Sequence, residues 1–144
     1  MNQKVLNFSN QFKKHAVVDV RSGDQVRVSQ KIKEGSKERV QVFEGLVIRV
    51  KNKNLISSSI MVRKIASGVA VEKSFMLHAP SVEKVEVIKR QKVRRKYLTY
   101  MRERTGKSTR LKPATKFNAE EVNALPEAPK KDSAPAEETT EQKA

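Results

Sequence analysis

Residues 38–50 read ERVQVFEGLVIRV, and this stretch decides the fold. Its apolar residues recur with a two-residue period, at Val40, Val42, Leu46, Ile48 and Val50. A period of two places alternate side chains on opposite faces of a β-strand, so one face is predicted to be buried and the other exposed. Gly45 lies inside this pattern, and a glycine within a strand predicts a bulge or a sharp bend.

The same period appears in three other stretches of the chain. They are Val26 with Val28 and Ile32, then Val69 with Val71, Phe75 and Leu77, and finally Val85 with Val87. Turn-forming residues separate the stretches, at 22–24, 34–36, 51–54, 67–68 and 78–81. Short strands with sharp turns, few aromatic residues and no alternation with helices predict a small antiparallel β-barrel or sandwich over residues 16–88.

Helical patterns flank this β domain, so the predicted class is mainly β with flanking helices. Residues 1–15 carry one apolar face at the helical period, which predicts a short helix docked on the domain. That face consists of Val5, Phe8 and Phe12. A second apolar face predicts a helix from Val93 to Arg104, ended by Gly106 and followed by an extended arm to Lys112. The second face consists of Val93, Tyr97 and Met101.

Residues 113–144 differ from the rest of the chain in composition. They carry 4 basic and 7 acidic residues, against 27 and 9 in residues 1–112. Asn118 and Glu121 fit the cap of one short helix, which Pro126 would end. The rest of this Pro-, Ala- and Glu-rich tail offers little apolar surface, so it is predicted to be disordered.

Basic residues concentrate between Lys89 and Lys112, where eleven Lys or Arg accompany one acid, Glu103. The whole chain has 144 residues and a formal net charge of +15. Packing so many like charges together works against a compact state, so we expect a polyanion to supply the counter-charge. Nucleic acid fits best, because Lys and Arg replace the counterions condensed on its phosphates. The alternative is a basic helix face that is only solvated.

The predicted RNA-binding residues come from this segment and from three other places. Lys51 and Lys53 lie on a polar turn, the adjacent Arg63 and Lys64 would point to opposite faces of a strand, and a further cation is Arg39. The residues of the basic segment are Lys89, Arg90, Lys92, Arg94, Arg95, Lys96, Tyr100, Arg102, Arg104, Lys107, Arg110 and Lys112. A tyrosine in this segment can stack on an unpaired base or pack on the domain. We expect packing for Tyr97 and leave both roles open for Tyr100.

The sequence offers little for catalysis or metal binding. It has no cysteine, and its two histidines, His15 and His78, are 63 positions apart. The stretch Gly106-Lys107-Ser108 ends like a phosphate-binding loop, but that motif requires a glycine at the position of Met101. Scattered acids predict ion pairs with nearby cations. Because the sequence has no long apolar run, we expect a cytoplasmic protein that does not contact membrane. Because it shows no catalytic or metal-binding set, we expect that the protein needs no cofactor or metal and is not an enzyme.

Several segments, in order along the chain, resemble those of bacterial large-subunit ribosomal protein nineteen. The matching segments are ERVQVFEG at 38–45, VRKI at 62–65, SGV at 67–69, VE at 71–72, LH at 77–78 with Pro80, KVRRKYL at 92–98, and GK at 106–107 with Arg110. The resemblance covers residues 2–112. Gln91, Met76, Ala70 and the loop 51–54 depart from the family pattern, and they leave the shapes of the loops open.

The resemblance implies an SH3-like barrel and a structural role in the large ribosomal subunit. It implies binding to large-subunit RNA near the subunit interface, contact with small-subunit RNA, and large-subunit ribosomal proteins three and fourteen as neighbours. Two other classes of protein fit the residues less well. An architectural DNA-binding protein lacks support because no helix-turn-helix or dimerisation seam is visible. An RNA-modifying enzyme would need a cofactor loop or an acid/base set.

Overall fold

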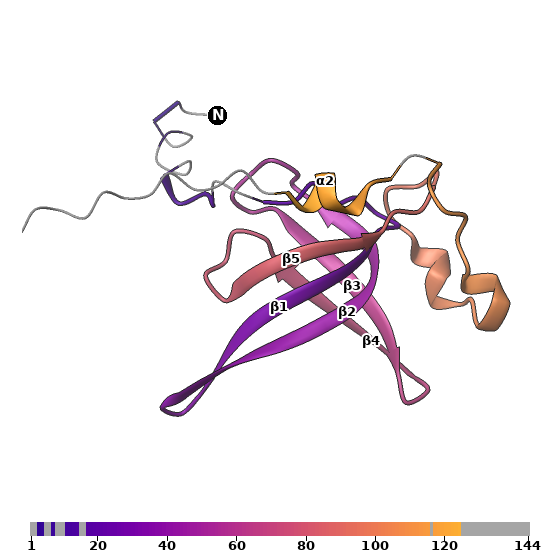
Figure 1. Cartoon of the computed structure of the whole chain (residues 1–144), viewed down its shortest axis with the longest axis horizontal. Helices are drawn as coiled ribbons and strands as arrows, with labels where there is room; N and C mark the ends of the chain where they lie inside the picture. The colour runs from indigo at the N-terminus through magenta and orange to yellow at the C-terminus, as the bar shows by residue number, and fades with distance from the viewer. Residues whose placement is uncertain (1–2, 5–6, 8–10, 15–16, 116, 125–144) are drawn as a thin grey trace, which may run out of the picture.

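The computed structural model describes residues 3–4, 7, 11–14, 17–115 and 117–124. Its centre is one antiparallel sheet with the strand order β4-β3-β2-β1-β5. The strands are β1 (Gln25–Glu34), β2 (Lys37–Lys51), β3 (Ser59–Ala66), β4 (Val69–Met76) and β5 (Val82–Lys89). Figure 1 shows a strongly twisted sheet from which the β1–β2 and β3–β4 hairpins extend at two corners. The prediction of a mainly β protein is therefore confirmed.

Turns in the structure coincide with the predicted turn residues. Gly35 and Gly68 join the two hairpins with φ of 62° and 80°, a left-handed conformation that glycine adopts without steric cost. The β2–β3 loop uses Asn52 and Asn54 in the same region, with φ of 49° and 70°. Asparagine tolerates this conformation better than most residues. Turn chemistry thus placed the ends of the strands correctly.

The main core lies between the inner faces of the strands. Its best-buried members are Val26, Val28, Val47, Ile60, Val62, Phe75 and Val87, all at most 2% exposed. A second, smaller cluster forms where residues after β5 cover β2. Its buried members are Ile48, Leu98 and Met101. The two clusters together show that β2 is covered on both faces in its second half, since Val47 and Ile48 are consecutive.

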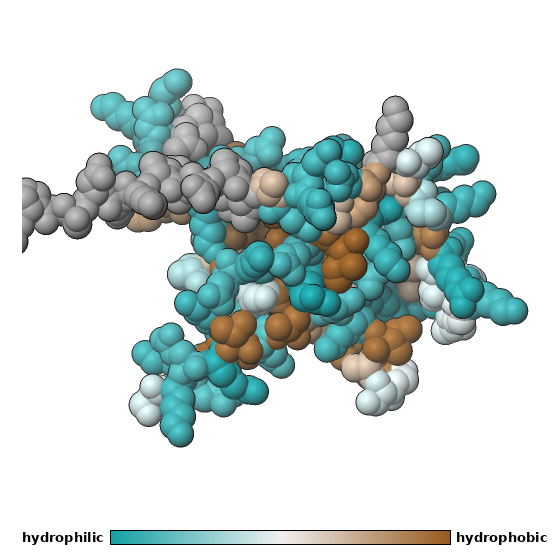
Figure 2. Space-filling view, in the orientation of Figure 1, coloured by the Kyte–Doolittle hydropathy of each residue, from teal (hydrophilic) through white to brown (hydrophobic). Residues whose placement is uncertain are grey.

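The predicted buried face of β2 is wrong in part. Val40 and Val42 are each 51% exposed, whereas Phe43 and Val47 belong to the main core. The reason is that the first half of this 15-residue strand extends beyond the core in the β1–β2 hairpin. Figure 2 shows apolar patches between the charged side chains toward the two hairpins.

Of the two features predicted at Gly45, a bulge or a sharp bend, the bulge is wrong. Gly45 pairs regularly with Val26, and the ladder shifts register between Val47 and Arg49 instead. Glycine is required at position 45 for another reason, because a Cβ there would lie 2.4 Å from the carbonyl oxygen of Arg63. Such close approach of a neighbouring strand is the second reason for a glycine within a sheet.

The sheet is open in the part of the chain that the structure describes. Its pairing ends at β4 on one side and β5 on the other, and no ladder joins these edges among the described residues. The closure that a barrel requires is therefore not seen, and the SH3-like barrel stays a prediction. Edge strands leave backbone groups unpaired, and here one edge is covered by a helix.

That helix is α2 (Ala119–Asn123), which lies along β5 in Figure 1. The Asn123 side chain accepts a hydrogen bond from the Val87 N–H at 2.8 Å and donates one to the Val87 carbonyl at 2.9 Å. Asn118 stands at the predicted cap position, although its side chain makes no capping hydrogen bond. Phe117 and Val122 pack against the main core, so the docked chain continues beyond the predicted boundary at Lys112.

The predicted helix from Val93 to Arg104 is wrong. Residues 90–98 form irregular chain with isolated bridges, and only two short 3-10 turns follow, η1 (Thr99–Arg102) and η2 (Gly106–Thr109). The backbone N–H of Leu98 donates to the Ile48 carbonyl of β2 at 2.9 Å, a bond that replaces the one a helix would make. Gly106, with φ of 59°, begins η2 and does not end a helix. The predicted extended arm to Lys112 is wrong for the same segment, because η2 folds its first half and Leu111 packs on the smaller cluster.

Two predictions fall largely outside the described residues. Most of the predicted N-terminal helix, including Val5 and Phe8, lies there, as does the tail from residue 125 with Pro126. Within the described ranges, no helix is long and apolar enough to cross a membrane.

Candidate nucleic-acid interface

Residues 90–112, which we call the C-terminal coil, are fixed on the sheet by their apolar side chains. Leu98 is fully buried and Met101 is 4% exposed, both against Ile48. Val93 packs over the turn before β1, where a Cβ on Gly23 would lie 2.7 Å from its side chain. Because the apolar side chains point into this contact, the basic ones between them point away from it.

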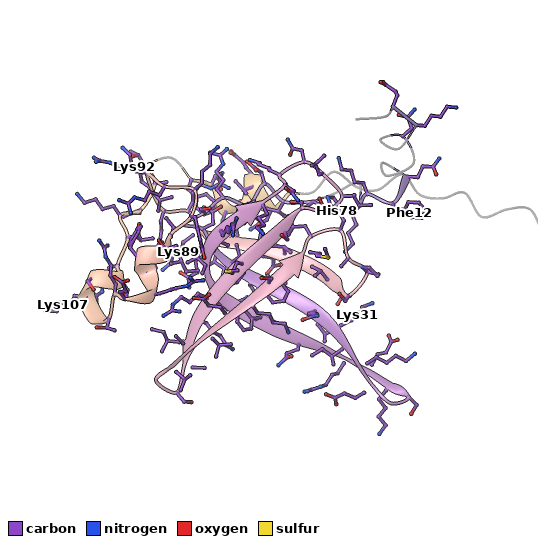
Figure 3. The ribbon with its side chains drawn as sticks, turned by 180° about the vertical axis from the view of Figure 1, so that it is seen from behind. Phe12, Lys31, His78, Lys89, Lys92 and Lys107 are labelled. Carbon is purple, nitrogen blue, oxygen red and sulfur yellow. The ribbon has the colours of Figure 1, made fainter. Side chains whose placement is uncertain are left out.

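All basic residues from Lys89 to Lys112 are exposed except Arg90. Figure 3 shows Lys89, Lys92 and Lys107 at the same end of the molecule, away from Phe12 and Lys31. The structure therefore leaves the C-terminal part of the predicted RNA-binding set exposed, and it brings Lys92, Arg94, Arg95 and Arg104 together around one cavity. The exposed members of this part of the set are Lys89, Lys92, Arg94, Arg95, Lys96, Arg102, Arg104, Lys107, Arg110 and Lys112.

Arg90 is used inside the fold. Its guanidinium pairs with the fully buried carboxylate of Asp24 at 3.2 Å and donates to the Asp19 carbonyl at 2.8 Å. The same group lies 5.5 Å from the centre of the Phe117 ring. Burial raises the pKa of the Asp24 carboxyl, although the Arg21 N–H and Arg90 oppose this by stabilising its charge. Arg90 thus anchors the start of the C-terminal coil.

Glu72 joins the sheet to the C-terminal coil through two arginines. Its carboxylate lies 2.8 Å from both Arg63 and Arg102, and Arg63 also donates to the Arg102 carbonyl at 3.2 Å. The hydrogen bond from Arg102 lowers the pKa of Glu72, with Arg63 adding to the effect against partial burial. In return, Glu72 raises the pKa of Arg102. Arg63 is only 15% exposed, so its charge is largely compensated within the chain.

The two tyrosines of the C-terminal coil have different surroundings. Tyr97 forms a backbone bridge with Arg49, and its ring centre lies 4.8 Å from the Arg49 guanidinium and 5.6 Å from that of Arg102. This agrees with the expected packing role. Tyr100 packs partly on the smaller cluster, with the guanidinium of Arg104 at 4.5 Å from its ring centre and that of Arg95 at 5.8 Å. Sequence reasoning missed Arg49, because it lies within an apolar strand pattern.

Two cavities open beside Arg104. One, of about 340 Å³, is lined by Lys92, Val93, Arg94, Arg95, Tyr100 and Arg104. The other, of about 260 Å³, lies against the sheet and also includes Arg104. No carboxylate lines either cavity within the described chain. This region combines an aromatic ring, concentrated positive charge and concave shape, which are the features that bind single-stranded nucleic acid.

The other predicted cations lie outside the C-terminal coil, although Lys64 lines the cavity of about 260 Å³ together with Arg104. Arg39 stands near the tip of the β1–β2 hairpin and pairs with Glu34 at 2.7 Å. Lys64 lies half-buried over the Phe43 ring at 4.6 Å, and Lys51 is exposed at the end of β2. The structure therefore does not gather the whole predicted set on one surface.

Lys53 lies in the loop after β2 and pairs with Asp19 at 2.5 Å. Partial burial alone would raise the pKa of Asp19, but Lys53 and Arg21 outweigh it and lower that pKa.

The loop that carries Lys53 borders an open cavity of about 530 Å³ that Lys13, Lys14 and His78 also line. His78 accepts the Lys14 N–H there, and burial together with Lys13 and Lys14 lowers its pKa. The described residues contain no group of three His, Cys, Asp or Glu side chains that could hold a metal ion.

The chain is similar to a known family of proteins. The family model described as Ribosomal protein L19 matches residues 3–114. The "Large ribosomal subunit protein bL19" of Malacoplasma penetrans (strain HF-2) is 47% identical over 137 residues, which cover 94% of this chain and 93% of that protein. The protein of the same name from Mesomycoplasma hyopneumoniae (strain 232) is 61% identical over 90 residues, or 62% of this chain and 74% of that protein.

A relative from a third organism has the same name. The protein with this name from Synechococcus sp. (strain JA-2-3B'a(2-13)) is 50% identical over 94 residues, covering 65% of this chain and 74% of that protein. The family match spans the sheet, the C-terminal coil and the residues that join them. The chain therefore belongs to the ribosomal protein L19 family, and it is a structural, non-enzymatic constituent of the large ribosomal subunit.

Proposed function

We propose that this protein binds large-subunit ribosomal RNA through the C-terminal coil. The proposal rests on one observation, which is that the apolar side chains of this coil are buried and the basic ones are exposed. Leu98 and Met101 are buried against the sheet, while every basic residue from Lys89 to Lys112 except Arg90 is exposed. A surface of this kind can exchange condensed counterions for its own cations along an RNA backbone.

The proposal assigns different roles to the predicted RNA-binding residues. Arg90 and Arg63 hold the fold together, since their guanidinium groups pair with Asp24 and Glu72. The exposed cations of the coil other than Arg102, which is paired with Glu72, contact phosphates. Arg39, Lys51 and Lys53 form separate, weaker contacts, because they do not line the cavities of the coil and two of them already have partners within the chain. Lys64 lines the cavity of about 260 Å³ together with Arg104 of the coil, but it also lies over the Phe43 ring.

We further propose a place at the subunit interface, with small-subunit RNA and large-subunit ribosomal proteins three and fourteen as neighbours. This rests on the family resemblance, as does the proposal that the sheet belongs to an SH3-like barrel. Two segments are suited to reach a second RNA. They are the exposed loop 51–54 and the arm 107–112. The cations of this arm are exposed, although its Leu111 packs on the smaller cluster and the Lys112 carbonyl accepts the Lys92 N–H at 2.9 Å.

The test is the salt dependence of binding to a large-subunit RNA fragment. Replacing Arg94 and Arg95 with Glu is expected to weaken binding and to flatten the slope of log K against log salt by about 0.7 to 0.9 for each phosphate that the variant no longer neutralises. Lys31→Glu with Lys84→Glu is the matched control, because it makes the same change in net charge on β1 and β5. The proposal fails if both double variants change the slope equally, or if neither does.

A further inference from the structure

The cavity of about 340 Å³ beside Tyr100 has features that binding to phosphates alone does not require. Its lining joins four cations with one aromatic ring and one aliphatic side chain. Two segments build it, the irregular chain 92–95 and the turn that carries Tyr100, and both are held by the smaller core cluster. Its volume lies within the range of cavities that bind small organic ligands.

The cations of this cavity have no acidic partner in the part of the chain that the structure describes. Within the described ranges, no carboxylate lies within ion-pair distance of Lys92, Arg94, Arg95 or Arg104. Arg102, two positions before Arg104, differs because Glu72 holds it at 2.8 Å. Four uncompensated charges around one cavity favour an anionic occupant, and arginine is suited to binding phosphate through paired donors.

The aromatic ring adds a requirement for a flat partner. Tyr100 is only partly buried, and its nearest charged neighbours, Arg104 and Arg95, lie 4.5 and 5.8 Å from its ring centre. Guanidinium groups stack on a nucleobase as they do on a tyrosine ring. Tyr97 is less suited to stack on a base. Its backbone is bridged to Arg49, and the guanidinium groups of Arg49 and Arg102 lie near its ring. Arg49 belongs to the sheet and Arg102 is paired with Glu72, so neither group is available to a ligand.

A neighbouring polar atom points to the same occupant. Arg104 also lines the adjacent cavity of about 260 Å³, together with Gln91. The side-chain oxygen of Gln91 is buried and has no hydrogen-bond partner among the described residues. Buried polar atoms are usually satisfied, so this acceptor suits a donor from a ligand, such as a ribose hydroxyl or a base amino group.

We infer that this cavity receives a single unpaired nucleotide of RNA, with its base stacked on Tyr100 and its phosphates among Lys92, Arg94, Arg95 and Arg104. A base inside a duplex is paired and stacked and cannot enter, so the RNA must present a bulged or looped-out residue. The inference rests on the proposed RNA-binding function and deepens it. It makes part of the binding depend on RNA structure and not on phosphate number alone.

Three short RNAs test this inference with the full-length protein. One is a perfectly paired hairpin, the second carries a one-nucleotide bulge in the same stem, and the third has an abasic ribose in place of the bulged base. We expect the bulged RNA to bind about 5- to 100-fold more tightly than the abasic one, since stacking of one base on an aromatic ring contributes in this range.

Substitutions at Tyr100 then identify the site. Tyr100→Leu keeps the apolar packing on the smaller cluster and removes the aromatic face, so it should abolish the preference for the bulged base. Tyr100→Phe, the matched control, should keep it. Affinity for the paired hairpin should stay unchanged in both, and this also reports whether each variant is folded.

The outcomes separate this inference from the proposed function. If the wild type binds all three RNAs equally with a steep salt dependence, the RNA-binding function stands and the nucleotide site is overturned. A preference that survives in Tyr100→Leu also overturns the site. If the wild type binds none of the three RNAs, the proposed function itself fails.

Discussion

The sheet and the C-terminal coil differ in how many of their cations are paired with an acid. In β1 to β5 most of the described ion pairs join a cation to an acid on the same or a neighbouring strand, such as Arg27 with Glu44 and Lys31 with Glu83. In the C-terminal coil only Arg90 and Arg102 have such partners among the described residues. The two paired cations hold the coil on the sheet, and the unpaired ones are left for a polyanion.

This difference separates the cations that are paired within the described chain from those that the proposed RNA-binding function would use. Exposed pairs like those on the sheet contribute little to the free energy of folding, typically about 0 to 1 kcal/mol each. Their main effect here is to offset part of the charge of the five strands, which carry 12 basic and 6 acidic residues. The excess of positive charge is larger in the C-terminal coil, which carries 10 basic residues and one acid.

The largest expected effect comes from removing the apolar contact that places the coil. Leu98→Ala leaves a cavity at a fully buried position, and such changes cost about 2 to 5 kcal/mol. We expect the free energy of unfolding, measured in urea, to fall by this amount, and RNA affinity to fall with it. Leu55→Ala, at a residue that is 40% exposed, is the control and should change stability by less than about 0.5 kcal/mol. Equal effects at both positions would mean that the coil is not anchored through Leu98.

A smaller effect is expected on the association of the two ribosomal subunits. Lys107→Ala with Arg110→Ala removes unpaired cations from the arm, whereas Lys51→Ala with Lys53→Ala changes a loop in which Lys53 is already paired with Asp19. With fewer fixed cations between facing phosphates, association should require more magnesium, and the arm variant should shift more than the loop variant.

A magnesium titration on sucrose gradients measures this shift. Ribosomes carrying the wild type and each double variant are compared for the concentration at which half of the subunits are associated. Identical midpoints in all three would remove the proposed interface role from these residues. Normal assembly of the isolated large subunit is required in each case, because otherwise the shift reports a missing protein.

The smallest expected effect concerns the link between the coil and the sheet at low pH. The pKa of Glu72 is lower in the folded chain than in the unfolded one, chiefly because of its hydrogen bond from Arg102. Its contribution to stability is therefore present above its ordinary pKa and lost as the pH falls through the lowered value. The melting temperature should fall in this acidic range, and less so in Glu72→Gln. Parallel curves for the wild type and Glu72→Gln would show that Glu72 does not link the two regions.

Much of the sheet could be predicted from the sequence, because turn residues and two-residue periods are local signals. The strand β3 does not show such a period, since Ile60, Met61 and Val62 are consecutive apolar residues and hide the alternation. The buried face of β2 was assigned wrongly because Val40 and Val42 continue the apolar pattern beyond the end of the core. Which part of a long strand is covered depends on neighbours that are distant in the sequence.

The C-terminal coil was harder to predict for a related reason. Its exposed charge was visible in the sequence, but the helical spacing of Val93, Tyr97 and Met101 was misleading. The β2 backbone offers this segment hydrogen bonds that replace those of a helix, and such tertiary contacts override local propensity. The cavity beside Tyr100 likewise depends on how segment 92–95 folds back, which no local pattern shows.

The pairing of Asn123 with Val87 has a consequence for the newly made protein. Chains emerge from the ribosome from the N-terminus at about 5 to 20 residues per second, and strand edges that are still open can capture other chains. The outer edge of β5 keeps its Val87 backbone groups unoccupied until residue 123, thirty-six positions later, has been added. Until residue 123 has emerged and docked, this edge of the sheet therefore remains open to pairing with another chain.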